Sequence, residues 1–185
     1  GLFLTSCIGL SDQETAALIN FVPFTHLTAK KVRAIIDHLK KGEPIDSLFE
    51  LPDTNIRYSP TQEKTIFFKD FTTGTSLEKL VKISPEEVIG LIKDSRLKGR
   101  GGAFFPTGIK WELCRNNSSD QKYIICNADE GEPGTFKDRV LLQRYASLLI
   151  EGMTIAGYAV GADKGIIYLR AEYFYLRDLV QNAID

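Results

Sequence analysis

The chain has 185 residues, a hydrophobic fraction of 43% and a net charge of −1 at pH 7. Its length fits one domain or two small ones, and its composition supports a hydrophobic core. The balanced charge gives no electrostatic case for a nucleic-acid or membrane-surface binder. No apolar run reaches the roughly 18 residues of a membrane span, and the first residues lack the charged start of a signal peptide.

Three cysteines lie far apart in the sequence and form no C-x-x-C pair: Cys7, Cys114 and Cys126. Their spacing argues against a disulfide framework and against a local zinc site. We therefore expect a cytoplasmic protein, because a reducing compartment suits a chain whose cysteine spacing indicates no disulfide framework. Cys114 and Cys126 are expected to be core or near-core thiols rather than catalytic ones.

Residues 1–42 are expected to be the end of a small α/β unit. Short strands are predicted at residues 2–5 and 16–19, followed by a helix over about residues 29–41. Thr28 is a suitable N-cap for that helix, and Gly42 can end it. Its apolar residues share one helical face: Val32, Ile35, Ile36 and Leu39. Residues 43–75 contain three prolines and are predicted to be a linker, with a possible strand at residues 65–68.

A strong helix start follows at Ser84. Ser84 can cap the helix, Pro85 occupies its first position, and Glu87 completes a capping box. The helix is expected to end near Ser95. Its buried side is predicted to consist of Val88, Ile89, Leu91 and Ile92.

The run from Gly99 to Lys110 is a glycine-rich loop with a cation near each end. Glycines permit positive φ and let a ligand approach the backbone, and consecutive N–H groups can then hold a phosphate. Arg100 and Lys110 add positive charge. The spacing is neither the G-x-G-x-x-G fingerprint nor a P-loop, and a plain turn is an alternative interpretation.

An apolar strand beginning at Tyr123 runs into an acidic loop. An amide and three acids fall within six residues of that loop: Asn127, Asp129, Glu130 and Glu132. Carboxylates can accept hydrogen bonds from sugar hydroxyls and ring N–H groups. A solvated surface loop is the alternative. Together with the phosphate-binding pattern upstream, the loop suggests a nucleotide or flavin ligand.

A βαβ unit is predicted from residues 123 to 169. A buried helix is expected over residues 147–160 and a second apolar strand over residues 165–169, so the two strands should be parallel. Ligands bind beyond the carboxyl ends of such strands. That edge would bring the acidic loop next to residues 170–173, which follow the second strand. A last helix is expected over residues 174–184.

The two motifs closely resemble those of the flavin-binding 51 kDa subunit of respiratory complex I and its family. They read GRGGAFFPTGIKW from Gly99 and CNADEGEPGTFKDR from Cys126. Relatives in that family include the diaphorase subunit of soluble NAD-reducing [NiFe]-hydrogenases and the beta subunit of NAD-dependent formate dehydrogenases. The resemblance covers roughly residues 76–185 and implies the amino-terminal part of an α/β domain that binds FMN and NAD(H).

The run Cys7–Gln13 resembles part of a thioredoxin-like [2Fe–2S] domain, with Ser11 in place of the second thiolate of its C-x-x-x-C pair. Because serine is a poor ligand for iron, we expect no intact cluster. The run looks most like the hydrogenase branch. The expected division is therefore a degenerate thioredoxin-like segment at residues 1–42, a linker at 43–75 and the flavin domain at 76–185.

The resemblance also implies site residues, although no side chain need act as acid, base or nucleophile. Gly99, Arg100, Gly101, Gly102 and Lys110 match positions around the FMN phosphate and ribityl chain. Asn127, Asp129, Glu130 and Gly131 match positions that line the flavin. Phe105 matches an aromatic that stacks on the NADH side, Glu132 and Glu172 match acids that hold NAD(H), and Tyr173 matches a neighbouring position.

The implied activity is hydride transfer between NAD(H) and FMN, with single electrons exchanged with iron–sulfur clusters. Implied partners are an iron–sulfur electron-transfer subunit and hydrogenase subunits. The cysteine-rich region for a [4Fe–4S] cluster is expected in a carboxyl-terminal part beyond these residues or in a partner. Alternatives are a complex I subunit, a formate dehydrogenase subunit or a degenerate docking scaffold; a nucleotide kinase is disfavoured because it would need a P-loop.

Two residues depart from the family pattern. Phe104 stands where the family usually has glycine, and Ala171 stands where glycine is frequent. If the position of Phe104 requires positive φ, phenylalanine is strained there.

Overall fold

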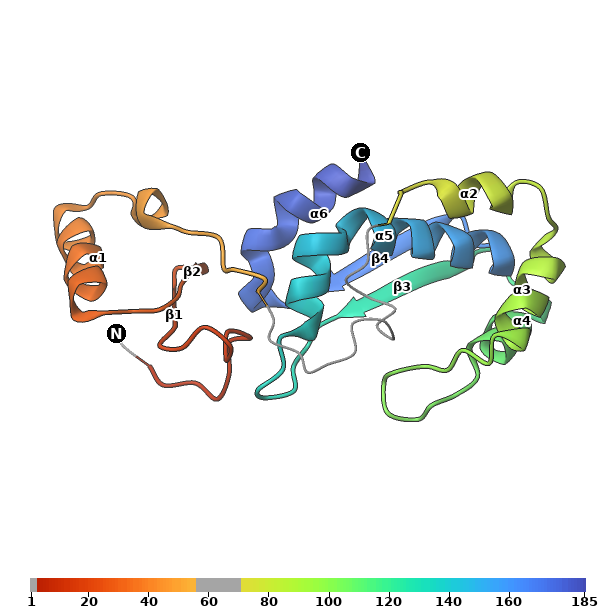
Figure 1. The fold of residues 1–185 in the computed structure, drawn as a ribbon, viewed down its shortest axis with the longest axis horizontal. Helices are drawn as coiled ribbons and strands as arrows, with labels where there is room; N and C mark the ends of the chain where they lie inside the picture. Colours follow the sequence, from red (N-terminus) through yellow and green to blue (C-terminus); the bar gives the residue numbers. More distant parts are fainter. Residues whose placement is uncertain (1–2, 56–70) are drawn as a thin grey trace. The chain divides into compact units, whose positions relative to one another are not determined.

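The computed structural model describes residues 3–55 and 71–185, whose elements are traced in Figure 1. The chain forms two compact units that alternate along the sequence. Unit 1 contains Gly1–Thr61, Asn127–Ala146 and Leu169–Asp185, and unit 2 contains Gln62–Cys126 and Ser147–Tyr168. The division at residues 42 and 75 stays a prediction, and the strand predicted at residues 65–68 lies outside the described residues.

Unit 1 begins with a hairpin and a helix. Strands β1 (Ala17–Ile19) and β2 (Val22–Phe24) pair antiparallel. Asn20 and Phe21 between them both have positive φ, which matches the twist of a two-residue hairpin turn. The strand predicted at residues 2–5 is wrong for its described part, because residues 3–5 have no regular structure.

Helix α1 (Ala29–Lys41) has the predicted bounds and caps. The Thr28 hydroxyl accepts the N–H of Lys31, and Gly42 has a φ of 70°. Only Ile35 of the helix is buried, in a small core with Phe24 and with Ile45 of the 3-10 helix η1 (Ile45–Leu48). The other apolar residues of the same helical face are between 39% and 45% exposed: Val32, Ile36 and Leu39.

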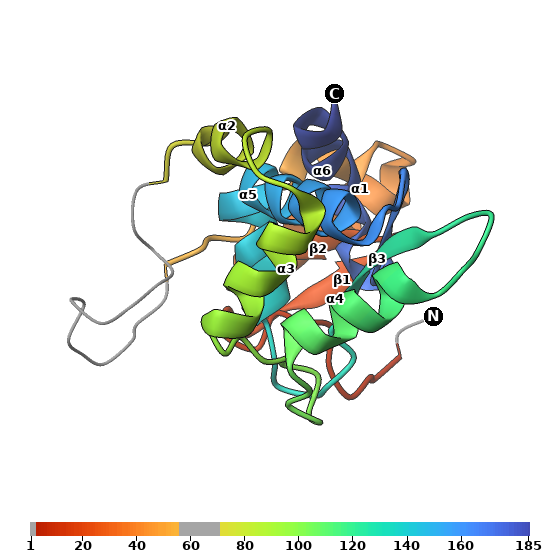
Figure 2. The same ribbon diagram turned by 90° about the vertical axis from the view of Figure 1, so that its right-hand side faces the viewer.

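In the described part of unit 2, three helices precede the sheet: α2 (Thr75–Leu80), α3 (Pro85–Asp94) and α4 (Thr107–Asn116). The predicted capping box at Ser84 is confirmed, since Ser84 and Glu87 each accept the other's backbone N–H. Helices α3 and α4 lie side by side (Figure 2). Val88 and Ile89 are buried with Leu80 and Ala159, whereas Leu91 is 59% exposed, contrary to prediction.

Strands β3 (Tyr123–Ala128) and β4 (Lys164–Leu169) form a two-stranded sheet, and their arrows point the same way in Figure 1. The predicted parallel βαβ unit is therefore confirmed. Its helix α5 (Lys137–Val160) begins ten residues earlier than predicted, and Tyr145 has non-helical φ and ψ inside it. The sequence did not indicate this earlier start, because the glycines and the proline at residues 131–134 are typical of a loop and lie just before the first turn of the helix.

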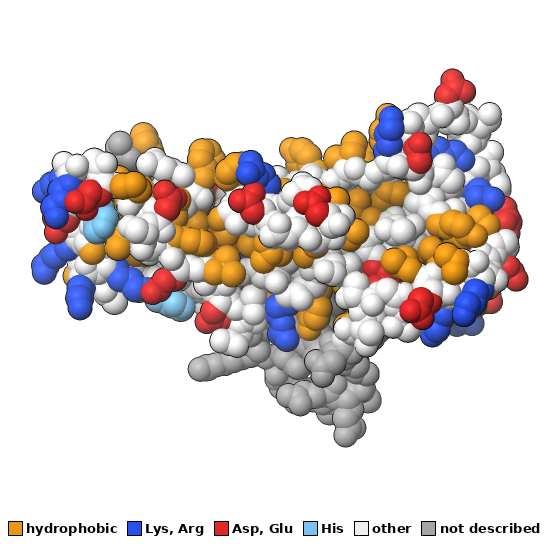
Figure 3. All heavy atoms as spheres, turned by 90° about the horizontal axis from the view of Figure 1, so that it is seen from above, with side chains coloured by type: hydrophobic (Ala, Val, Ile, Leu, Met, Phe, Trp, Pro, Cys, Tyr) orange, Lys and Arg blue, Asp and Glu red, His pale blue; other side chains and the backbone are white. Residues whose placement is uncertain are grey.

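The chain ends in a 3-10 helix, η3 (Ala171–Leu176), followed by α6 (Arg177–Ile184). The predicted last helix therefore begins as a tighter turn. Among the described residues, no helix is both long and apolar enough to cross a membrane. Figure 3 shows hydrophobic side chains reaching one face of the molecule among charged ones, with Lys and Arg gathered where α1 lies.

Candidate functional site

The carboxyl ends of β3 and β4 meet in unit 1. The N–H of Arg170, directly after β4, donates to the carbonyl of Ala128 at the end of β3 over 3.1 Å. Because the strands are parallel, the polar segments that follow them start at the same edge of the sheet. The structure thus brings the predicted acidic loop together with the segment that contains Glu172 and Tyr173.

Glu130 has a fully buried carboxylate that caps a helix. Its oxygens accept the backbone N–H groups of Asp138 at 2.7 Å and Arg139 at 3.2 Å, in the first turn of α5. A carboxylate at a helix N-terminus is favoured by the helix dipole and by the unpaired N–H groups there. The Glu130 backbone has a φ of 33°, so the loop turns sharply at this residue. The Glu130 carboxylate therefore forms its hydrogen bonds with groups of the protein itself.

Tyr173 also binds Glu130, whose Oε1 lies 3.5 Å from Nζ of Lys137. Its hydroxyl donates to Glu130 Oε2 over 2.6 Å, and the side chain is fully buried. Burial, together with the hydrogen bond to Glu130, raises the pKa of Tyr173 far above its ordinary value. The phenol is thus a fixed neutral donor, and it contacts the acidic loop from the buried side.

The remaining residues of the acidic loop are exposed: Asn127, Asp129, Gly131 and Glu132. The Asn127 side-chain oxygen accepts the N–H of Asp129 over 3.1 Å, which fixes the turn after β3. The carboxylates of Asp129 and Glu132 make no hydrogen bond with any residue that the structure describes. They remain available to hydroxyl and N–H donors of a ligand.

Glu172 is held in a fixed orientation by its neighbour two residues upstream. Arg170 donates to both carboxylate oxygens, from Nε over 2.9 Å and from Nη2 over 3.1 Å. Burial alone would raise the pKa of Glu172, but the hydrogen bonds and charge of Arg170 outweigh it and lower the pKa. Glu172 is therefore a charged, oriented acceptor at the sheet edge.

The glycine-rich loop of unit 2 is closed at its base by backbone pairing. The N–H of Gly99 donates to the carbonyl of Phe105, and that of Thr107 donates to the carbonyl of Leu97, each over 2.9 Å. The loop leads into α4, whose first turn carries no side-chain cap. The side chains of Arg100 and Lys110 make no hydrogen bond or ion pair within the described ranges. Free backbone donors, a helix N-terminus and two cations suit a phosphate.

Two aromatic residues lie in this loop. Phe104 has a φ of 50°, in the left-handed region. The glycine that the family usually has at this position adopts such a φ without strain, whereas phenylalanine is strained there. Gly102 has a φ of 105° and supplies the other left-handed turn. Phe105 is 48% exposed and can offer its ring to a ligand.

Gly108 fixes how closely α4 approaches α3, and sequence reasoning did not single it out. A Cβ at this position would lie 2.6 Å from Cγ and 2.7 Å from the backbone N of Lys93. The first turn of α4 can pack on α3 only without a side chain. No helix was predicted over residues 107–116, so the sequence carried no signal that this glycine lies in a helix contact.

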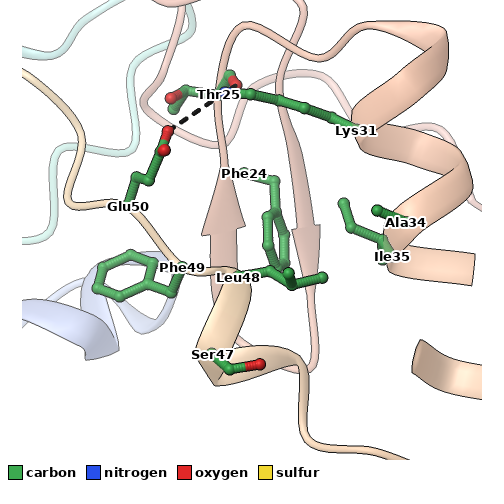
Figure 4. A pocket seen from close by; sticks show the side chains of 9 residues that line it. All are labelled: Phe24, Thr25, Lys31, Ala34, Ile35, Ser47, Leu48, Phe49 and Glu50. Atoms are coloured by element: carbon green, nitrogen blue, oxygen red, sulfur yellow. Dashed lines mark hydrogen bonds and ion pairs between the residues drawn. The ribbon is translucent and has the colours of Figure 1, made fainter. Parts of the chain in front are cut away.

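A separate hollow of about 290 Å³ lies in unit 1, between β2, α1 and η1 (Figure 4). Phe24, Ile35 and Leu48 provide an apolar floor, and the ion pair of Lys31 with Glu50, 3.2 Å apart, stands at its edge. It contains none of the predicted site residues.

Two buried arginines of unit 1, Arg139 and Arg170, were also missed as residues that hold the site in place.

Comparison with known proteins identifies the family. The Nuo51 FMN-binding domain matches residues 92–185. The alpha subunit of the NAD-reducing hydrogenase HoxS from Cupriavidus necator is 51% identical and covers 100% of this chain, which spans 33% of that subunit. In Aquifex aeolicus, a subunit of the NADH-quinone oxidoreductase is 51% identical over 58% of this chain and 26% of its own length.

A crystal structure of an NAD⁺-reducing [NiFe]-hydrogenase in the H₂-reduced state superposes with a TM-score of 0.84. It is 42% identical, and the match covers 96% of this chain and 31% of that one. The chain thus spans about a quarter to a third of the length of these relatives. The α/β fold and the resemblance drawn from the two motifs are confirmed: the chain belongs to the Nuo51 FMN-binding domain family.

Proposed function

We propose that this chain is part of an FMN- and NAD(H)-binding diaphorase subunit of an NAD-reducing hydrogenase. The observation that carries this proposal is the match to the hydrogenase alpha subunit along the whole chain, including the amino-terminal segment. The match to the quinone oxidoreductase covers 58% of the chain. A complex I subunit is therefore the second candidate, supported by equal identity over that shorter range.

The residues of the glycine-rich loop suit the phosphate and ribityl part of FMN. Gly101 and Gly102 offer backbone N–H groups without side chains in the way, and Arg100 and Lys110 supply charge. Gly99, whose N–H pairs with the carbonyl of Phe105, is assigned to the closed base of the loop. Phe105 provides an exposed ring for stacking on the dinucleotide side. These assignments rest on the motif match and on the exposure and geometry of this loop.

The acidic loop after β3 and residues 170–173 after β4 together form what we call the acidic half of the proposed site. This half suits the hydroxyl and N–H donors of FMN and of NAD(H). Asn127, Asp129 and Gly131 are assigned to the flavin, and Glu132 and Glu172 to the dinucleotide. Glu130 and Tyr173 are assigned to the same site, and their mutual hydrogen bond indicates that they support the loop from behind. When bound, FMN supplies the chemistry by accepting a hydride and releasing electrons one at a time. The protein's task is to bind and orient both ligands.

The proposed partners are an iron–sulfur electron-transfer subunit and hydrogenase subunits, because the relatives are subunits of larger enzymes. A further iron–sulfur cluster is proposed for a carboxyl-terminal part or a partner. We propose a cytoplasmic location, because the three cysteines are widely spaced in the sequence and form no C-x-x-C pair.

The test uses the full-length protein, purified without oxygen. Acid release of the flavin should give stoichiometric FMN, and NADH should bleach the flavin absorbance without added metal or partner. Hydrogen should reduce NAD⁺ only in the complex with its partners. A folded protein that contains FMN but is not bleached by NADH would contradict the diaphorase assignment, and one without FMN would favour the docking scaffold.

A further inference from the structure

Arg170 is the most connected side chain of the acidic half. The residue is 8% exposed, and its guanidinium donates four hydrogen bonds. Nη1 donates to the carbonyl of Glu130 over 2.8 Å, and Nη2 donates to the carbonyl of Cys7 over 2.6 Å. Nε and Nη2 also hold the two carboxylate oxygens of Glu172. One planar group therefore joins three segments that are far apart in the sequence.

The amino-terminal segment Cys7–Gln13 is attached to the same loop at further points. The Cys7 sulfur accepts the N–H groups of Gly9 and Gly134, each over 3.4 Å. A Cβ at Gly9 would collide with the phenol of Tyr173, so the segment packs directly on that ring. These contacts place the segment behind the acidic loop.

A second buried arginine repeats this arrangement. Arg139, in the first turn of α5, is fully buried and pairs with Asp12. It also donates to the carbonyl of Asp53 over 2.8 Å, and that residue receives a hydrogen bond from Gln13. The segment is thus fastened at both ends, by Arg170 at Cys7 and by Arg139 at Asp12.

We propose that Arg170 is a positioning residue of the dinucleotide site, and that the segment Cys7–Gln13 is the anchor against which it holds Glu172 and the acidic loop. This rests on the proposed function for the ligand and on the hydrogen bonds above for the geometry. The segment that resembles a cluster-binding domain would then contribute to nucleotide binding. Arg170 contacts no reacting atom and acts through Glu172 and the Glu130 carbonyl.

The consequence is a selective loss of NADH binding. Without Arg170, Glu172 can rotate and the loop loses the hydrogen bond to the Glu130 carbonyl. The NADH ground state and the transition state then lose the same amount of binding free energy. Such a change raises KM and leaves kcat nearly unchanged. Residues that orient a binding group from behind contribute roughly ten- to hundredfold in metal sites, and we expect about a tenfold rise here.

The experiment compares Arg170→Gln, Arg170→Lys and Arg177→Gln in the full-length protein. Arg177 is the matched control, because its side chain is 62% exposed and contacts near neighbours in the chain, through an ion pair with Asp178 and a cation–π contact with the ring of Phe174. KM and kcat for NADH are measured with a dye acceptor, alongside FMN content. We expect KM to rise in Arg170→Gln, to rise less in Arg170→Lys, and to stay unchanged in Arg177→Gln.

A double-mutant cycle with Glu172→Gln shows whether Arg170 acts through Glu172. We expect Arg170→Lys to change KM in the wild-type background and much less in the Glu172→Gln background. Full additivity, or an unchanged KM in an FMN-loaded Arg170→Lys protein, would overturn the proposal. Because the lysine variant keeps the buried charge, it serves if the glutamine variant does not fold.

Hydrogen exchange separates this inference from the proposed function. The amides of residues 127–134 should exchange faster in Arg170→Lys than in Arg177→Gln, whether or not the protein binds FMN. If wild-type protein is not bleached by NADH, the proposed function fails while this readout still tests the anchor. Equal exchange in the two variants would contradict the anchor itself.

Discussion

The acidic half and the glycine-rich half of the proposed site are built in opposite ways. In the acidic half, Glu130, Arg170 and Tyr173 are buried and bind one another, and the exposed carboxylates of Asp129 and Glu132 are left for a ligand. In the glycine-rich half, the loop is exposed and its cations have no partner among the described residues. A site that uses carboxylates needs support from behind, whereas a phosphate site can be made from backbone and free cations.

The largest expected effect concerns the support in the acidic half. Glu130→Gln would turn an amide NH₂ toward N–H donors of α5 and remove the negative charge at the helix start. We expect the free energy of unfolding to fall by about 3 kcal/mol, measured by urea denaturation. Glu132→Gln, which alters an exposed carboxylate, should leave stability unchanged. Equal stability of the two variants would show that Glu130 does not hold the loop.

The next effect tests the glycine-rich half. Lys110→Met removes an exposed cation whose side chain makes no hydrogen bond or ion pair with the described residues. We expect FMN affinity to fall about tenfold or more, because a charge-assisted hydrogen bond to phosphate is lost. Flavin fluorescence titration measures this, and urea denaturation should show unchanged stability. Lys98→Met in the same loop base provides the control, and equal losses in both variants would argue against a specific role for Lys110.

A smaller effect is expected at Phe104. Its φ of 50° costs a residue with a Cβ about 1 kcal/mol that glycine does not incur. Phe104→Gly should therefore raise the free energy of unfolding by up to about 1 kcal/mol and retain FMN binding, whereas the β-branched Phe104→Val should lower it. Loss of flavin in the glycine variant would indicate that the ring itself contributes to the site.

The smallest effect concerns the anchor segment. Hydrogen bonds from the N–H groups of Gly134 and Gly9 lower the pKa of Cys7 below that of an ordinary thiol. Their contribution to stability is present above the unfolded thiol's pKa and is lost as pH falls through the lower folded value. Alkylation of Cys7, followed by peptide mass spectrometry, should fall off at lower pH in the folded than in the urea-unfolded protein. Coincident curves would contradict this geometry.

The ends of two helices, the parallel strand pair and the family could be predicted from the sequence. Thr28 and Gly42 bound α1, and Ser84 and Glu87 start α3, because caps act within a few residues. The parallel strand pair followed from two apolar runs around a helical one. The motifs were specific enough to give the family.

Contacts between distant residues were not readable. Cys7 and Arg170 are 163 positions apart, and Asp12 and Arg139 are 127 apart. Neither pair has a periodic or capping signature. Glu130 looked like one more loop acid, and only its neighbours Asp138 and Tyr173 show that its carboxylate is buried. Leu91 followed the helical period but meets solvent, because periodicity does not tell which neighbour covers a face.

The central claim is that the two halves bind different parts of the ligands, and one paired measurement tests it most directly. FMN content and KM for NADH are determined for Lys110→Met and Glu132→Gln in the full-length protein. The account predicts that Lys110→Met loses FMN, whereas Glu132→Gln retains FMN and shows a raised KM for NADH. Loss of the same ligand in both variants would contradict the division of roles.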